Sequence, residues 1–158
     1  MSSPIIEWRG IAPPFGVVTT QSLIGSGYNG AIPMGTSSVV VTLRLYNNFS
    51  AANGITDATS CVLAAYDDAI NQGNATSPAA KNKYLHVKVL DYNGIVTNAD
   101  TQYYAIGGTT KHPIPTNGGT IGGATPNYVT VSLKIMAPTN AVQGSVSQGV
   151  WLEYNTTS

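Results

Sequence analysis

The sequence has very little charge. Asp, Glu, Lys and Arg make up 9% of its 158 residues, and seven bases balance seven acids, whereas a typical soluble domain has roughly 25% charged residues. Nucleic-acid binding depends on clustered Lys and Arg that displace counterions from phosphates. The basic residues are scattered along this chain, which argues against a nucleic-acid partner. They are Arg9, Arg44, Lys81, Lys83, Lys88, Lys111 and Lys134.

Cysteine is almost absent as well. Cys61 is the only one, so no disulfide can form within the chain. It begins the apolar run Cys-Val-Leu-Ala-Ala at 61–65. This setting predicts a buried thiol that packs as a small hydrophobic group rather than a reactive one.

Long apolar segments are missing too. No stretch approaches the roughly 18 apolar residues of a membrane span, and the first residues lack the basic-then-apolar pattern of an export signal. We therefore expect no membrane partner and synthesis in the cytoplasm without a signal peptide. The polar composition suits a protein that works outside cells, so a virion or another extracellular assembly is the predicted location.

Catalytic constellations are not apparent. The two histidines are His86, in an alternating run, and His112, in a predicted loop, and neither has a carboxylate close in sequence. The G-x-G-x-x-G pattern at 25–30 continues into Ala-Ile-Pro, which cannot begin the helix that a dinucleotide site needs. The sequence predicts a protein that is not an enzyme, with no catalytic, metal or cofactor-binding residues.

Uncharged polar residues are abundant instead. Ser, Thr, Asn and Gln together number 49, and hydrophobic residues make up 42% of the chain. An uncharged surface of hydroxyls and amides repels its neighbours weakly. Such a protein tolerates close packing against copies of itself.

Alternating patterns predict a mainly β structure. The clearest strands are 38–47, 83–91 and 127–136, and weaker candidates are 16–24, 95–97, 102–106 and 149–154. The Asp-Tyr-Asn-Gly tetrad at 91–94 predicts a tight hairpin turn.

Residues 57–73 are the ambiguous segment. The spacing of Val62, Leu63, Tyr66 and Ile70 favours a short helix. A strand over 61–66 that runs into a loop remains the alternative.

Long loops rich in Gly, Asn and Thr separate these elements. The pattern predicts an all-β fold with at most one short helix, namely a β-sandwich of jelly-roll type. Residues 17–158 form its single domain, and residues 1–16 form an extended arm.

The arm combines prolines with apolar side chains that need cover. We expect it to dock on its own domain or on a neighbouring copy. The candidate assembly residues are Ile5, Ile6, Trp8, Ile11 and Phe15.

Aromatic side chains are the other candidate contact residues. In sheets they fill cross-strand pairs or interfaces, or stack on sugar rings. The residues selected are Tyr28, Tyr103, Tyr104, Tyr128 and Trp151.

These features favour a non-enzymatic structural protein that assembles with copies of itself and with a larger protein shell such as a capsid. An outer virion component, either a decoration (cement) subunit or a minor coat protein, is the leading hypothesis. The alternatives are a carbohydrate-binding, adhesive β-sandwich module with a glycan ligand, and a filament subunit.

Overall fold

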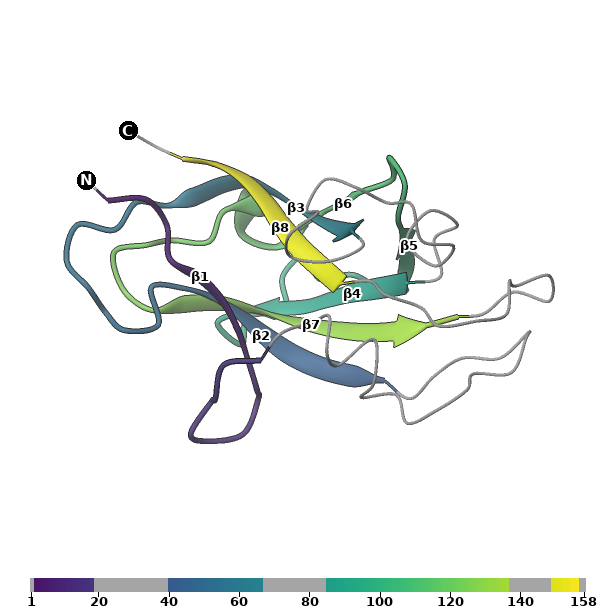
Figure 1. Cartoon of the computed structure of the whole chain (residues 1–158), viewed down its shortest axis with the longest axis horizontal. Helices are drawn as coiled ribbons and strands as arrows, with labels where there is room; N and C mark the ends of the chain where they lie inside the picture. Colours follow the sequence, from purple (N-terminus) through teal and green to yellow (C-terminus); the bar gives the residue numbers. More distant parts are fainter. Residues whose placement is uncertain (1, 19–39, 67–84, 137–148, 157–158) are drawn as a thin grey trace.

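Two antiparallel β-sheets face each other in the computed structural model, which describes residues 2–18, 40–66, 85–136 and 149–156 (Figure 1). The larger sheet has the order β1-β2-β7-β4-β5, and the smaller has the order β6-β3-β8. The elements are β1 (Ile6–Arg9), β2 (Val41–Asn47), β3 (Ala58–Tyr66), β4 (Leu85–Tyr92), β5 (Tyr104–Ile106), β6 (His112–Pro113), the 3₁₀ turn η1 (Thr116–Gly119), β7 (Asn127–Ile135) and β8 (Gly149–Thr156). The predicted all-β sandwich is confirmed.

The chain passes from the larger sheet to the smaller one three times, between β2 and β3, between β5 and β6, and between β7 and β8. The strands before the first and third passages, β2 and β7, pair with each other in the larger sheet. The strands after them, β3 and β8, pair with each other in the smaller sheet. The B–E and C–F strand pairs of immunoglobulin-type sandwiches have this same adjacency. It does not establish the jelly-roll arrangement, which stays a prediction.

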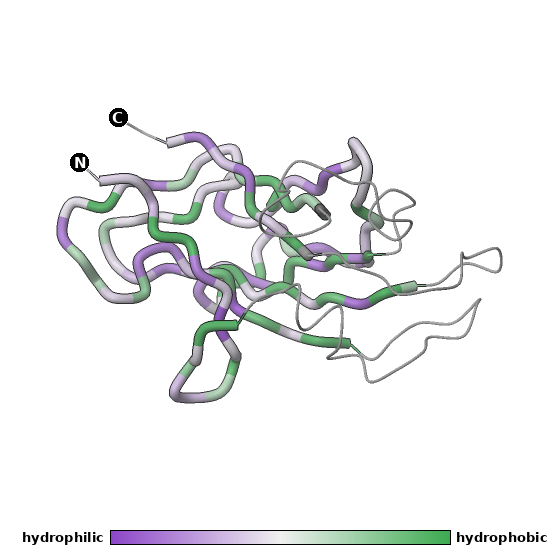
Figure 2. Tube along the Cα trace, in the orientation of Figure 1, coloured by the Kyte–Doolittle hydropathy of each residue, from purple (hydrophilic) through white to green (hydrophobic). Residues whose placement is uncertain are grey.

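Apolar and polar residues alternate along the strands (Figure 2), and the buried apolar side chains of both sheets form one core cluster. The inward side chains of β2, β4 and β7 were predicted correctly, because one face of each strand carries only apolar residues. The smaller sheet contributes its own inward residues. The largest fully buried apolar side chains are Leu45, Leu63, Leu85, Val87, Val89, Ile106, Ile121, Val129, Val131, Leu133 and Val150.

The favoured helix prediction for 57–73 is wrong where the structure describes this segment, since 58–66 is strand β3. Its pairing with β8 shifts register between Thr59 and Val62, and Ser60 adopts a φ of 51° there. This bulge breaks the period-two pattern. Cys61 and Ala64 are both buried, so the strand has no polar face that would reveal a period-two pattern in the sequence.

The weaker strand predictions had mixed outcomes. Segment 102–106 contains β5, and segment 149–154 lies within the longer β8. Segment 95–97 is not a strand, because only Ile95 bridges back to Tyr92. The predicted tight turn before it is present, with Asn93 and Gly94 at φ 52° and 83°. In segment 16–24, Val17 bridges to Arg9, and the part from 19 onward lies outside the described residues, as does the pattern at 25–30.

The beginning and end of the described chain attach to the same short segment. Ser2 forms a parallel bridge with Ile55, and Thr156 pairs with Ala58 at the start of β3. Between these contacts, β1 forms an edge of the larger sheet by pairing with β2. In the part of the chain that is described, there is no helix of the length and apolarity required to cross a membrane.

Candidate binding surfaces

The five arm residues have different environments. Trp8 is 8% exposed and belongs to the core, and Ile6 packs against that core. Ile5 and Phe15 are half-buried, while Ile11 is 50% exposed. The arm is therefore docked on its own domain, and the chain itself covers four of the five side chains that were expected to need a partner.

The selected aromatic residues do not form a single cluster. Tyr103 and Tyr128 lie on the larger sheet, Tyr104 stacks on His112, and Trp151 faces Ala64 across the smaller sheet. Tyr28 lies outside the described residues. The indole Nε1 of Trp151 is buried without a hydrogen-bond partner in the described structure.

The outward side of the larger sheet carries most of the described positive charge. Arg9, Arg44, Lys88 and Lys134 all project from it, because each occupies an outward position of its strand. They are four of the five described Lys and Arg; the fifth is Lys111. We call this side the outer face. It comprises Glu7, Arg9, Thr42, Arg44, Tyr46, His86, Lys88, Asp91, Tyr128, Thr130, Ser132 and Lys134.

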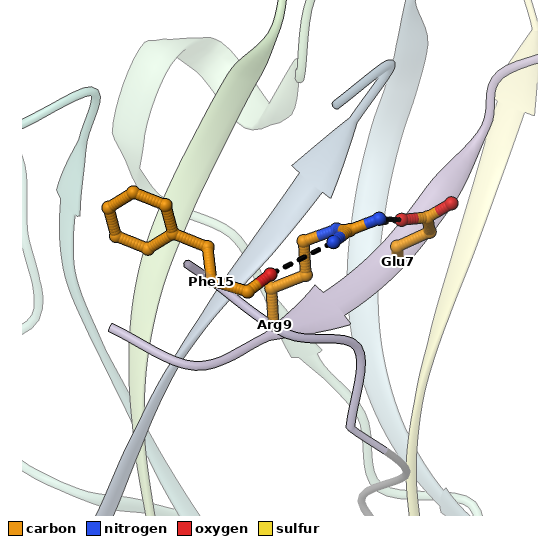
Figure 3. Close-up of polar contacts among 3 residues, drawn as sticks. All are labelled: Glu7, Arg9 and Phe15. Atoms are coloured by element: carbon orange, nitrogen blue, oxygen red, sulfur yellow. Dashed lines mark hydrogen bonds and ion pairs between the residues drawn. The ribbon is translucent and has the colours of Figure 1, made fainter. Parts of the chain in front are cut away.

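Arg9 holds the arm on this face (Figure 3). Its guanidinium Nε donates to Glu7 Oε2 at 2.8 Å, and its Nη1 donates to the carbonyl oxygen of Phe15 at 2.9 Å. The guanidinium also lies 3.7 Å from the centre of the Phe49 ring. Glu7 thus neutralises Arg9 locally, and the charge of Arg9 serves the docking of the arm.

Arg44 has no carboxylate partner among the described residues. Its guanidinium lies 4.1 Å from the ring centre of Tyr128 and 4.9 Å from that of Phe15. Its Nη1 donates to the Tyr46 hydroxyl at 3.0 Å. Aromatic rings attract a cation through their negative faces without neutralising it, so Arg44 is held in place with its full charge.

Lys88 and Lys134 share one aromatic ring. Their Nζ atoms lie 5.7 and 4.1 Å from the centre of the Tyr103 ring, and no described carboxylate pairs with either. His86 lies opposite Lys134 across β4 and β7. Burial lowers the pKa of His86, and the positive charge of Lys134 lowers it further.

The sequence contained the signal for this cluster, but scattering along the chain hid it. Arg44, Lys88 and Lys134 alternate with apolar residues in the three clearest strands. Aligning those strands in one sheet places their polar positions on one side. The pairing order that brings the strands together could not be known from the sequence.

A second surface lies at the end of the sandwich formed by loops 48–57, 93–99 and 120–126 (left in Figure 1). Asn47 and Asn48 are fully buried there. Asn47 accepts the Ile5 N–H and donates to the carbonyl oxygens of Thr56 and Ile121. Asn48 accepts the Ala52 N–H and donates to the carbonyl oxygens of Ala52 and Gly123. Buried amides with this many partners fix the loops in one geometry.

Further hydrogen bonds complete this end. Asp57 Oδ1 accepts the Gly123 N–H at 2.8 Å, and Asn93 Nδ2 donates to Asn127 Oδ1 at 2.7 Å. Asp57 is the only charged residue in the three loops. Ile95 and Val96 are 60% and 70% exposed beside the Asn93–Gly94 turn. We call this surface, with its apolar pair and one engaged carboxylate, the uncharged end.

His112 and Asp100 form a buried polar link between the sheets. His112 Nε2 lies 2.8 Å from Asp100 Oδ2, which also accepts the Val89 N–H at 2.8 Å. The Tyr104 ring stacks on the imidazole with 4.3 Å between ring centres. His112 was predicted in a loop, but it lies in β6 of the smaller sheet, whereas Asp100 is bonded to β4 of the larger one. The pair is enclosed and joins the two layers.

Cys61 is buried as predicted. Burial raises the pKa of its thiol from 9.0 to about 11, although a backbone hydrogen bond opposes the shift. Within the described residues, no three His, Cys, Asp or Glu side chains gather into a possible metal-ligand group.

In comparisons with known proteins, no family model matches this chain and no curated protein is similar to it. The case for a function therefore rests on the two surfaces.

Proposed function

We propose that this chain is a non-enzymatic structural protein that assembles with copies of itself as an outer component of a virus particle, as a decoration or minor coat subunit. The observation that supports assembly best is the uncharged end. It is a rigid surface with exposed Ile95 and Val96 and one charged residue, Asp57, which is already hydrogen-bonded.

The energetics of this surface suit a protein–protein contact. Covering exposed apolar side chains is favourable by roughly 25 cal/mol per Å². The loops are fixed by buried amides of Asn47 and Asn48, so binding costs little additional ordering of the backbone. Removing charged groups from water is a common cost at the centre of an interface, and this surface has few charges to desolvate.

The arm contributes less to the proposal than its composition suggested. Ile6 and Trp8 are satisfied within their own subunit, and only Ile11 extends into solvent. The assembly contact proposed for the uncharged end does not require exchange of the arm between copies.

Light scattering of the full chain after size exclusion, over a range of concentrations, tests the proposal. We expect oligomers that grow with concentration in the parent protein and a monomer in the Ile95→Thr/Val96→Thr double variant. Ile11→Thr is the control, because it removes a half-exposed apolar side chain elsewhere. A parent protein that stays monomeric at millimolar concentration would contradict self-assembly.

A particle location needs its own test, because self-association occurs in many settings. Electron microscopy of the concentrated protein should show assemblies of defined size or regular lattices, which the double variant fails to form. Amorphous aggregates alone would count against a role in an ordered shell.

A further inference from the structure

We infer that the outer face of the larger sheet binds an acidic polysaccharide, with Arg44, Lys88 and Lys134 receiving its carboxylates. This site is separate from the uncharged end, and the inference does not depend on the assembly proposal.

The charge distribution points to an anionic ligand. The whole chain is neutral, yet the outer face has four positive charges and two carboxylates, Glu7 and Asp91, of which Asp91 lies opposite Thr130 in the row of Arg44. Glu7 is bound to Arg9, and Asp91 accepts the Thr130 hydroxyl and the Gly94 N–H. Three cations on the face therefore lack an anionic partner among the described residues.

The cations are positioned before any ligand arrives. Tyr128 and Phe15 flank the Arg44 guanidinium, and the Tyr103 ring lies against Lys88 and Lys134. A free lysine or arginine loses substantial rotamer entropy when it binds an anion. Side chains that are already held against rings lose less, so the same charges give tighter binding.

Neutral groups of the face suit a sugar chain. The Thr42 hydroxyl is partly exposed in the row of Lys88, 3.1 Å from the buried Ser132 hydroxyl, and the Thr130 hydroxyl beside Arg44 donates to Asp91. Hydroxyls such as these donate and accept hydrogen bonds, which matches the hydroxyls of a sugar ring. The half-exposed rings of Tyr103 and Tyr128 offer apolar surface for the carbon faces of the sugars.

The spacing of the charges argues against nucleic acid. Arg44, Lys134 and Lys88 lie on three successive strands, β2, β7 and β4, which are about 4.8 Å apart. Three unpaired cations spread over three strands are few for duplex DNA, which carries one charge per roughly 1.7 Å. An acidic polysaccharide, whose carboxylates are separated by whole sugar units, matches this sparse distribution better.

Binding of the full chain to polygalacturonate, measured by calorimetry at low salt, tests the inference. The matched neutral probe is the same polymer with its carboxylates methyl-esterified. Poly-L-glutamate and a single-stranded thymidine oligonucleotide represent an acidic protein and a nucleic acid. We expect binding to polygalacturonate that weakens with added salt and exceeds binding to the other three probes.

Two single variants locate the site. Arg44→Gln and Lys134→Gln should each weaken binding by about tenfold, since each removes a charge-assisted hydrogen bond. Lys111→Gln is the control, because Lys111 lies away from the outer face and pairs with Glu153. Melting temperatures of the variants check that each remains folded.

Several results would overturn the inference. These are no binding to polygalacturonate, equal binding to the esterified polymer, stronger binding to polyglutamate or the oligonucleotide, and an equal loss in Lys111→Gln.

Discussion

Single residues explain why Asn and Gly are so common in this chain. At the uncharged end, Asn47 and Asn48 reach backbone groups 74 and 75 residues away. Gly123 lies so close to the 55–56 backbone that a Cβ on it would be 2.2 Å from the Thr56 carbonyl oxygen. Residues that seem typical of a flexible loop are in this case required by close packing and buried hydrogen bonding.

Gly123→Ala should therefore be strongly destabilising. The new Cβ cannot be accommodated without moving the backbone of the Thr56 loop, and overpacking of this kind costs about 1–3 kcal/mol. Gly10→Ala is the control, since a Cβ at Gly10 meets nothing within 4 Å. Urea denaturation should show a lower midpoint for the first variant and little change for the second. Equal midpoints would mean that the Thr56 loop is free to move.

Cys61 gives a prediction for alkaline pH. Its pKa is raised to about 11 in the folded state, so the folded protein favours the neutral thiol more than the unfolded chain does. The resulting stabilisation is present below pH 9.0 and is lost as the pH rises through about 11.

The expected loss is at most about 2–3 kcal/mol. Unfolding free energies at successive pH values should fall more steeply for the parent protein than for Cys61→Ala, in which all other titrating groups are retained. Parallel curves would show that the thiol does not contribute.

At the scale of elements, β1 is an integral strand of the larger sheet. Trp8 fills the core from β1, while Ile11 in the following loop is half exposed. Trp8→Ala should reduce the unfolding free energy by about 3–5 kcal/mol. Ile11→Ala should change it by no more than about 0.5 kcal/mol. Chemical denaturation at a concentration where the protein is monomeric measures both. A small effect of Trp8→Ala would mean that the arm is dispensable for the fold.

The strand β6 depends on a single polar link to the larger sheet. His112→Ala would leave the Asp100 carboxylate with the Val89 N–H alone and would remove the ring stacked against Tyr104. We expect a loss of about 2–3 kcal/mol in unfolding free energy. His86→Ala serves as the control, because His86 projects from the outer face. A reversed order of the two histidine variants would show that the inter-sheet link contributes little.

The sequence was sufficient for the strands whose two faces differ. Val129, Val131 and Leu133 alternate with Tyr128, Thr130 and Ser132, so both the strand β7 and its inward face were predictable. β3 was not predictable for two physical reasons. Its residues are buried on both faces, and the bulge at Ser60 changes the phase of the pattern.

For the whole molecule, sequence reasoning gave the bulk properties but not the surfaces. Neutrality and low charge were evident, whereas the grouping of Arg44, Lys88 and Lys134 depends on the strand order β2-β7-β4. The uncharged end was hidden similarly, because its three loops are far apart in sequence and meet through contacts such as the Asn48 side chain with Gly123 and the Gly123 backbone with Thr56. Strand pairing is non-local, so both surfaces required the structure.

The charge balance leads to a prediction about solution behaviour. The isoelectric point is about 6.7, and proteins associate most readily where their net charge vanishes. Self-association should be strongest near pH 6.7 and weaker at about pH 5 and pH 9, as measured by static light scattering at low salt. Association that increases steadily away from the isoelectric point would indicate contacts dominated by charge.

The attachment of Ser2 at Ile55 and of Thr156 at Ala58 has a mechanical consequence. Tension applied to the two chain ends would enter the molecule at almost one point and would peel β1 from β2 and β8 from β3, one hydrogen bond after another. The central strands β2, β7 and β4 would carry little of that load at first. A shell reinforced by this sandwich would therefore have to transmit stress across the faces and loop ends of its subunits, not along their chains.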